Sequence, residues 1–275
     1  SGHRYLFDSK LGWRNIPNWS STTFNRSLRI NSKGLRDREY DFAKPTGVKR
    51  ALVLGDSFTW GYGVSNDEIY TEVLEARPAN ASPSWQVLNT AVSGWGTDQE
   101  LLFLVDEGFK YSPDIVVLAF YLINDPINNS ASPQYGLHKP VFADASLQLS
   151  NVPVPKPGSD APDVRSSLGP LQITMALISE MSRVCRERGI PLVVMKFGLF
   201  EMPDEPEDIA ANRQWTKAIT TVPHIHYFDL DQAFTAEGLT VEYLSGGMKF
   251  RHWNPNGHQA VARLLQADLA AKKLL

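Results

Sequence analysis

The sequence has a single cysteine, no long hydrophobic run and no marked excess of charge of either sign. With only Cys185, no disulfide can form within the chain. No stretch approaches the roughly 18 apolar residues that a membrane helix needs. A formal net charge of -3 gives no reason to expect nucleic acid or an anionic membrane as a partner. The 275 residues, 43% of them hydrophobic, instead predict a soluble globular protein with one sizeable core.

The N-terminus lacks the charged-then-apolar layout of a signal peptide. Residues 1–3, Ser-Gly-His, are typical of the remnant of an expression tag, so a signal or anchor could have preceded the sequence given. In that case we expect a bacterial periplasmic or other extracytoplasmic location, and otherwise a cytoplasmic one.

Apolar runs that alternate with segments of helical periodicity predict an α/β fold. Short runs that are apolar throughout read as buried strands, and longer segments with apolar residues at helical spacing read as helices. This alternation is typical of a parallel sheet covered on both faces. Strands are expected at residues 50–55, 85–92, 114–122, 191–197 and 226–230, and helices at residues 69–76, 98–109, 171–188, 204–220 and 255–274. Residues 78–83 are expected to end the first helix, Thr97 to cap the second and Asn254 the last.

Two segments fall outside this alternation. Residues 1–48 are predicted to form an extended arm with short strands, packed on a main domain of residues 49–275. Residues 126–169 are rich in Pro, Ser, Asn and Asp and too long for an ordinary connection. Within them, residues 139–142 and 147–155 could form a small hairpin. This insertion is either a wall or lid over a site or a mobile surface loop, and the sequence leaves both open.

The stretch 49–63, KRALVLGDSFTWGYG, ends a buried strand abruptly in Gly-Asp-Ser. Gly55 allows the chain to turn sharply, so the hydroxyl of Ser57 would stand clear of the sheet. Two interpretations are open on this stretch alone. Ser57 is a candidate nucleophile, or Ser57 or Thr59 caps the next helix, which is a common use of these residues.

Ser57 is one of four features that fall at the same edge of the expected sheet, the others being Gly94, Asn124 and His252. Ligands bind at the carboxyl edge of open parallel sheets. A serine hydroxyl needs an adjacent base, and a histidine is the usual choice. The oxyanion formed when Ser57 attacks a carbonyl needs donors, which the N–H groups of Ser57 and Gly94 and the amide of Asn124 could supply.

The motifs resemble those of the SGNH, or GDSL-type, hydrolases. Residues 55–57 (GDS) are similar to the first block of that family, residues 89–94 (NTAVSG) to the second and residues 123–125 (IND) to the third. The resemblance spans roughly residues 50–270, with the motifs in the expected order. The arm is also similar to one found ahead of this domain in many bacterial members.

The resemblance implies a flavodoxin-like three-layer sandwich with a five-stranded parallel sheet and no cofactor. It implies Ser57 and His252 as the catalytic pair, with Gly94 and Asn124 as oxyanion donors. The last block departs from the pattern, because the family usually places an aspartate two or three residues before the histidine, where Phe250 and Lys249 stand here.

The missing aspartate matters because losing the orienting acid lowers turnover about 10,000-fold in a serine protease. Three alternatives are open. A backbone carbonyl of residues 248–250 could accept the Nδ1 proton of His252, which we favour because it needs no long-range rearrangement. A distant acid could reach the ring, or the domain could be weak or inactive. The candidate distant acids are Asp229, Asp231 and Glu242.

Three tryptophans and two histidines near the expected strand ends are further candidates for a functional role. Trp60, Trp95 and Trp253 could pack in the core, or line the cleft and stack against a sugar ring or an acyl chain. His224 and His226 would face the same side of a strand, but without a third ligand in register no metal site is expected.

The remaining candidates are assigned structural roles. His258 is similar to a helix-start residue of the family's final block, Asp56 and Asp125 are expected to stabilise turns, and Cys185 to be a buried thiol. The glycines after the first strand fit neither the dinucleotide fingerprint nor the P-loop.

The principal hypothesis is a serine esterase that cleaves a small acyl ester through an acyl-enzyme on Ser57. The expected substrate is O-acetyl on a carbohydrate, which rests on the family resemblance and the tryptophans. An O-acyltransferase that hands the same group to a glycan is the alternative, since both share the first half-reaction. A third hypothesis is a catalytically silent glycan-binding or assembly protein. The expected partner is therefore a glycan or small-molecule ester.

Overall fold

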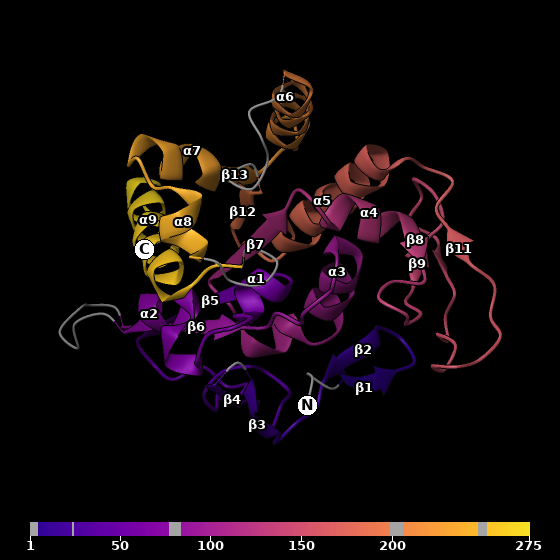
Figure 1. Cartoon of the computed structure of the whole chain (residues 1–275), viewed down its shortest axis with the longest axis horizontal. Coiled ribbons are helices and arrows are strands. Elements are labelled where there is room, and N and C mark those ends of the chain that lie inside the picture. Colours follow the sequence, from indigo (N-terminus) through magenta and orange to yellow (C-terminus); the bar gives the residue numbers. More distant parts are fainter. Residues whose placement is uncertain (1–4, 24, 77–83, 199–205, 247–251) are drawn as a thin grey trace.

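The computed structural model describes residues 5–23, 25–76, 84–198, 206–246 and 252–275 and has a five-stranded parallel sheet at its centre (Figure 1). The strand order is β13-β12-β7-β5-β6, and every neighbouring pair is parallel. The strands are β5 (Val48–Leu54), β6 (Ser84–Asn89), β7 (Ile115–Tyr121), β12 (Leu192–Phe197) and β13 (Ile225–Asp229). The predicted α/β class with a five-stranded parallel sheet is confirmed.

The three central strands, β12, β7 and β5, are mostly apolar because the middle of the sheet is buried on both faces. All seven residues of β7 are buried. Alternate residues point to opposite sides, so Val116, Leu118 and Phe120 belong to one hydrophobic cluster and Val117 and Ala119 to the other. This two-sided burial explains why the strands read as continuous hydrophobic runs.

Helices cover both faces, as Figure 1 shows for α2, α8 and α9 on one side and α3, α4 and α5 on the other. The first side carries α2 (Tyr70–Glu75), α7 (Leu230–Ala236), α8 (Val241–Ser245) and α9 (Pro255–Ala271). The second carries α3 (Thr97–Asp106), α4 (Asp125–Ser130), α5 (Pro170–Arg186) and α6 (Pro206–Thr220), with the 3-10 turn η2 (Gly108–Tyr111) after α3. No helix in the described parts of the chain is both long and apolar enough to span a membrane.

Most helix boundaries fall within a few residues of those expected, and one cap was wrong. The N-cap of α3 is Gly96, and Thr97 is already the first helical residue. Asn254 caps α9 as expected, accepting a hydrogen bond from the Gly257 N–H at 2.9 Å. The expected end of the first helix at residues 78–83 and the tag remnant at residues 1–3 lie outside the described residues.

Four short helices and one 3-10 turn were not predicted. They are α1 (Ser57–Trp60), η1 (Asn66–Glu68), α4, α7 and α8. Each is at most seven residues long, so the sequence contains too few residues in each for the 3.6-residue spacing of a helix to be recognised.

The N-terminal segment forms two hairpins, β1 (Tyr5–Asp8) with β2 (Gly12–Asn15) and β3 (Ser20–Thr23) with β4 (Arg26–Arg29). Beyond them, the buried Arg36 guanidinium donates to the carbonyls of Trp60, Gly61 and Val64. Burial lowers the pKa of Arg36 to about 9. The Trp13 indole donates to the Ser93 carbonyl at 3.1 Å, and Asp37 accepts the Asn89 N–H at 2.7 Å. The segment therefore holds the turns that follow β5 and β6.

The segment between α4 and α5 contains two short antiparallel pairs. One joins β8 (Ala131–Ser132) to β11 (Val164–Arg165), and the other joins β9 (Val141–Phe142) to β10 (Leu149–Ser150). The second pair is a hairpin at the place where the sequence suggested one. Phe142 belongs to the same hydrophobic cluster as α3 and α5, so this part of the insertion is packed on the domain.

Candidate active site

Ser57 and His252 meet at the carboxyl edge of the sheet. Ser57 opens α1 directly after β5, and His252 lies just before α9. His252 Nε2 lies 2.7 Å from Ser57 Oγ. This distance lets the imidazole accept the hydroxyl proton, which is the contact that general-base activation of a serine requires.

The tight turn at Ser57 depends on its two preceding residues. A Cβ on Gly55 would lie 2.4 Å from Thr59 Oγ1, so only glycine fits there. Asp56, and neither Ser57 nor Thr59, caps α1 by accepting the Phe58 N–H at 3.0 Å. The cap uses Asp56 Oδ1, while Asp56 Oδ2 lies 3.5 Å from Ser57 Oγ, a longer contact than the one between Ser57 and His252.

Asp56 also links Ser57 to the third strand end. Its Oδ2 accepts a hydrogen bond from Asn124 Nδ2 at 3.2 Å, which orients the amide that the sequence singled out as an oxyanion donor. Burial raises the pKa of Asp56 to about 6. Asp125, the next residue after Asn124, accepts the Tyr121 N–H at 2.9 Å and so stabilises the turn after β7.

Gly94 faces the same cavity from the turn after β6. Its φ of +85° is one that glycine adopts without strain. In the described part of the chain, no acceptor is found for the Gly94 N–H, which leaves this N–H available to a bound oxygen. The structure thus brings together all four features, around a cavity of about 380 Å³ lined by Ser57, Phe58, Tyr62, Ser93, Gly94, Tyr121, Ile123, Asn124, Tyr135 and His252.

Two aromatic rings contact the His252 imidazole. Phe58 is stacked on it, with ring centroids 4.5 Å apart and planes 28° apart. Tyr62 lies 4.7 Å away at 36°. The His252 side chain is mostly buried, at 8% exposed, so these contacts restrict the orientations that its ring can adopt.

Two of the three candidate orienting acids form ion pairs with a buried lysine. Asp229 Oδ2 and Asp231 Oδ2 lie 3.2 Å and 3.4 Å from Nζ of the fully buried Lys196. Glu242 is exposed on α8. The favoured backbone carbonyl, within residues 248–250, lies outside the described residues and stays a prediction, as do the three acids.

The tryptophans expected at the cleft do not line this cavity. Trp60, Trp95 and Trp253 are each at most 1% exposed and belong to hydrophobic clusters. Their positions next to the motifs did not indicate which way the indoles point. The aromatic lining comes instead from Phe58, Tyr62, Tyr121 and Tyr135, which the sequence analysis did not single out.

His258 has a structural role in the packing of two helices. His258 Nδ1 accepts the Tyr70 N–H at 3.2 Å, and burial lowers the pKa of His258 to about 3, so its ring is neutral and joins α9 to α2. His224 lies before β13 with a φ of +61°, so the expected strand alternation with His226 was wrong. Within the described residues, no group of three His, Cys, Asp or Glu side chains is placed to hold a metal ion.

Known proteins share this sequence pattern and fold. Residues 53–260 match the GDSL-like lipase/acylhydrolase family, whereas no curated protein matches the chain. A G-D-S-L family protein from Desulfitobacterium hafniense DCB-2 is 14% identical, with 80% of this chain and 99% of that one covered and a TM-score of 0.53. An acetylxylan esterase from Geobacillus stearothermophilus is 14% identical (80% and 94% covered, TM-score 0.53). A lipase/acylhydrolase from Enterococcus faecalis is 16% identical (82% and 96% covered, TM-score 0.51).

At these identities the solved structures show a shared fold. The family match covers most of the chain and includes the three strand ends that carry Ser57, Gly94 and Asn124. The chain therefore belongs to the GDSL-like lipase/acylhydrolase family.

Proposed function

We propose that the protein is a serine esterase that removes a small acyl group from an ester through an acyl-enzyme on Ser57. The observation that carries this proposal is the 2.7 Å separation of Ser57 Oγ and His252 Nε2. The cavity beside this pair is also lined by Gly94 and Asn124, so the nucleophile, base and oxyanion donors face one space.

The reaction follows from these positions. Ser57 Oγ attacks the carbonyl carbon while its proton passes to His252 Nε2. The carbonyl oxygen gains the negative charge and accepts hydrogen bonds from the Gly94 N–H and Asn124 Nδ2. When the tetrahedral intermediate collapses, the protonated His252 donates its proton to the leaving alkoxide. Water then attacks the acyl-enzyme with His252 as base, releasing the acid and restoring the Ser57 hydroxyl.

The size and lining of the cavity are consistent with a small acyl group. Its volume of about 380 Å³ lies at the lower end of the range for small-molecule sites. Tyr121 and Ile123 contribute aromatic and apolar surface that suits an alkyl group. The shared fold of the acetylxylan esterase makes an O-acetylated carbohydrate the first natural substrate to test.

Hydrolysis of p-nitrophenyl acetate by wild type and by Ser57→Ala tests the proposal. We expect Ser57→Ala to lose nearly all activity, because removing a catalytic serine costs up to about a million-fold in turnover. Ser93→Ala is the matched control, since Ser93 also lines the cavity but is assigned no chemical step. Equal rates for wild type and Ser57→Ala would overturn the proposal. Acetate release from acetylated xylooligosaccharides then tests the carbohydrate substrate.

A further inference from the structure

Tyr135 occupies a position in the chain where a tyrosine is costly. Gln134 and Leu137 exchange two backbone hydrogen bonds of 2.8 Å, which close a two-residue turn around Tyr135 and Gly136. Both central residues have positive φ, +53° for Tyr135 and +76° for Gly136. Turns of this kind favour Asn-Gly or Asp-Gly, because the left-handed conformation strains a residue with a larger side chain. A strained residue beside a site suggests a functional role for its side chain.

The side chain of Tyr135 lies against both proposed oxyanion donors. Its ring packs on Gly94, where an added Cβ would lie 3.1 Å from two ring atoms. Its hydroxyl accepts hydrogen bonds of 3.4 Å from Nδ2 of Asn124 and of Asn128. Because Asn124 gives its other amide hydrogen to Asp56, the Tyr135 hydroxyl takes the hydrogen that a substrate oxyanion would need.

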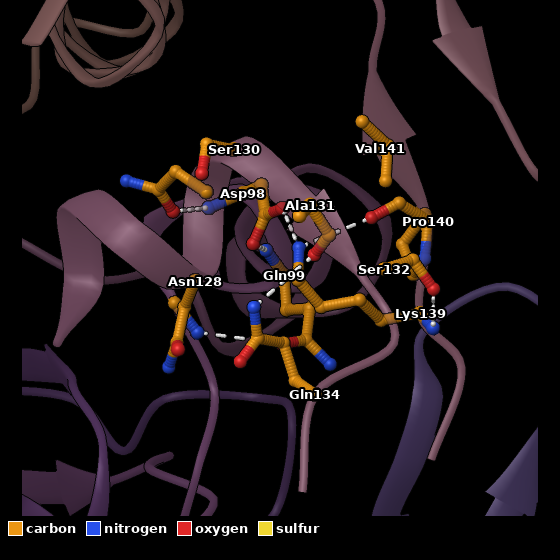
Figure 2. Close-up of polar contacts among 12 residues, drawn as sticks. Asp98, Gln99, Asn128, Ser130, Ala131, Ser132, Gln134, Lys139, Pro140 and Val141 are labelled. Atoms are coloured by element: carbon orange, nitrogen blue, oxygen red, sulfur yellow. Dashed lines mark hydrogen bonds and ion pairs between the residues drawn. The ribbon is translucent and has the colours of Figure 1, made fainter. Parts of the chain in front are cut away.

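The base of the turn is fixed while its tip is exposed. Lys139 forms an ion pair with Asp98 of α3, and both side chains are fully buried. The Lys139 N–H also donates to Ser132 Oγ at 3.0 Å, which ties the two ends of the loop together. Figure 2 shows Lys139 and Ser132 on neighbouring segments, with Asp98 close by. Tyr135 itself is 63% exposed and lines the cavity, so its ring borders the site from a loop whose base is anchored.

The position of Tyr135 determines which part of a substrate it meets. Around the attacked carbon, the oxyanion points to Gly94 and Asn124, and the leaving oxygen must face His252 to receive a proton. The acyl substituent takes the remaining direction, away from His252. Tyr135 lines the cavity beside Gly94 and Asn124, whereas the rings against His252, on the side of the leaving group, are Phe58 and Tyr62. The ring of Tyr135 therefore borders the side of the cavity away from His252, which is the side that the acyl substituent enters.

We propose that Tyr135 is a specificity-determining residue whose ring limits the length of the acyl group. This inference rests on the proposed esterase function and names the class of substrate that the site accepts, short-chain acyl esters. A longer chain would have to displace the ring from Gly94, and the anchored base of the loop opposes a larger movement.

The test compares kcat/KM for p-nitrophenyl hexanoate and p-nitrophenyl acetate in wild type, Tyr135→Asn and Tyr135→Phe. Asparagine tolerates the left-handed conformation and so preserves the turn, while phenylalanine keeps the ring and serves as the matched control. We expect the hexanoate-to-acetate ratio to rise at least about 10-fold in Tyr135→Asn, since one methylene is worth about 10-fold or more in a fitted pocket. Tyr135→Phe should keep the wild-type ratio.

An unchanged ratio in an active Tyr135→Asn enzyme would overturn the role of Tyr135 and leave the esterase proposal standing. If no variant shows ester turnover that depends on Ser57, the esterase proposal fails instead. The Tyr135 role is then decided by calorimetric titration of hexanoate into Ser57→Ala and Ser57→Ala/Tyr135→Asn. Hexanoate binding about 10-fold tighter to the double variant would support the proposal that the Tyr135 ring limits acyl length, and equal binding would overturn it.

Discussion

The imidazole of His252 is stacked on the ring of Phe58, with the two centroids 4.5 Å apart. Phe58 follows Ser57 in the chain, so the residue next to the proposed nucleophile helps to hold the proposed base. Related hydrolases usually orient this histidine with an aspartate two or three residues before it, and Lys249 and Phe250 stand at those positions here. Aromatic contacts are therefore one means of fixing the ring in this protein.

Replacing Tyr62, the second ring against His252, should lower kcat with little change in KM. An aromatic pair contributes about 0.5–1.5 kcal/mol beyond its buried area, which corresponds to a loss of about 2-fold to 10-fold in rate. We expect this loss in Tyr62→Ala, measured with p-nitrophenyl acetate. Tyr62→Phe keeps the ring and should retain wild-type kcat. A fully active Tyr62→Ala would show that the ring does not position His252.

Asn124→Ala should lower kcat by about 100-fold to 1,000-fold, the usual effect of losing one oxyanion donor. KM should change little, because the donor acts on charge that develops in the transition state. The Asn124 side chain makes no capping hydrogen bond to α4, so the substitution removes no helix cap, and thermal denaturation should confirm an intact fold. Wild-type kcat in this variant would remove Asn124 from the oxyanion site.

Glu100→Gln should stabilise the protein increasingly as the pH rises. Both carboxylate oxygens of Glu100 are buried with no hydrogen-bond partner among the described residues. Burial, with repulsion from Asp56 and Asp98, raises the pKa of Glu100 well above its usual range. The folded state therefore favours the protonated form of Glu100. The wild-type protein loses stability as the pH rises above about 4.3, the pKa of a glutamate in the unfolded chain, because Glu100 must then stay protonated or be buried with a charge. The carboxylate of Asp125 also repels that of Glu100. The positive charge of Lys139 is paired with Asp98.

The gain in Glu100→Gln should grow by up to about 1.4 kcal/mol per pH unit above that value, until the folded pKa is reached. Urea denaturation at pH 5 and pH 8 measures it, with the exposed Glu207→Gln on α6 as control. The same difference from wild type at both pH values would contradict the buried, protonated state of Glu100.

Lys139→Met should destabilise the protein by about 3–5 kcal/mol, because it leaves the buried Asp98 without its counter-charge. Adding Asp98→Asn should recover most of this loss, since the pair is then neutral and the amide oxygen can still accept the Gln99 N–H. Chemical denaturation of the two single variants and the double variant gives the coupling energy. If the two single effects simply add, the ion pair does not act as the anchor of the Tyr135 loop.

Most of the sheet could be predicted because its central strands are buried on both faces and are therefore mostly apolar. The second strand was expected to run to residue 92, but β6 ends at Asn89. The Thr90 and Val92 N–H groups still donate to the carbonyls of Val53 and Gly55, so the chain runs beside the preceding strand for a few residues more before the turn at Gly94. Such turns carry no periodic signal, and neither do the short helices α1, α7 and α8.

The candidate site was predictable where its residues follow strands. Ser57, Gly94 and Asn124 come directly after apolar runs, so the parallel sheet brings them to one edge. The position of Tyr135 over Gly94 could not be predicted, because it lies on a loop whose base is held by an ion pair between Lys139 and Asp98. The sequence does not show that these two residues, 41 positions apart, are in contact.

The contacts of Trp13, Arg36 and Asp37 with the turns after β5 and β6 bear on where a minimal catalytic unit begins. The family match starts at residue 53, yet both turns are braced by residues that come before it. A protein trimmed to the matched region would keep Ser57 and lose the residues whose hydrogen bonds brace the turns around it. In this chain the leading hairpins and the segment behind them are part of the framework of the GDSL-like domain, and an engineered version would have to retain or replace them.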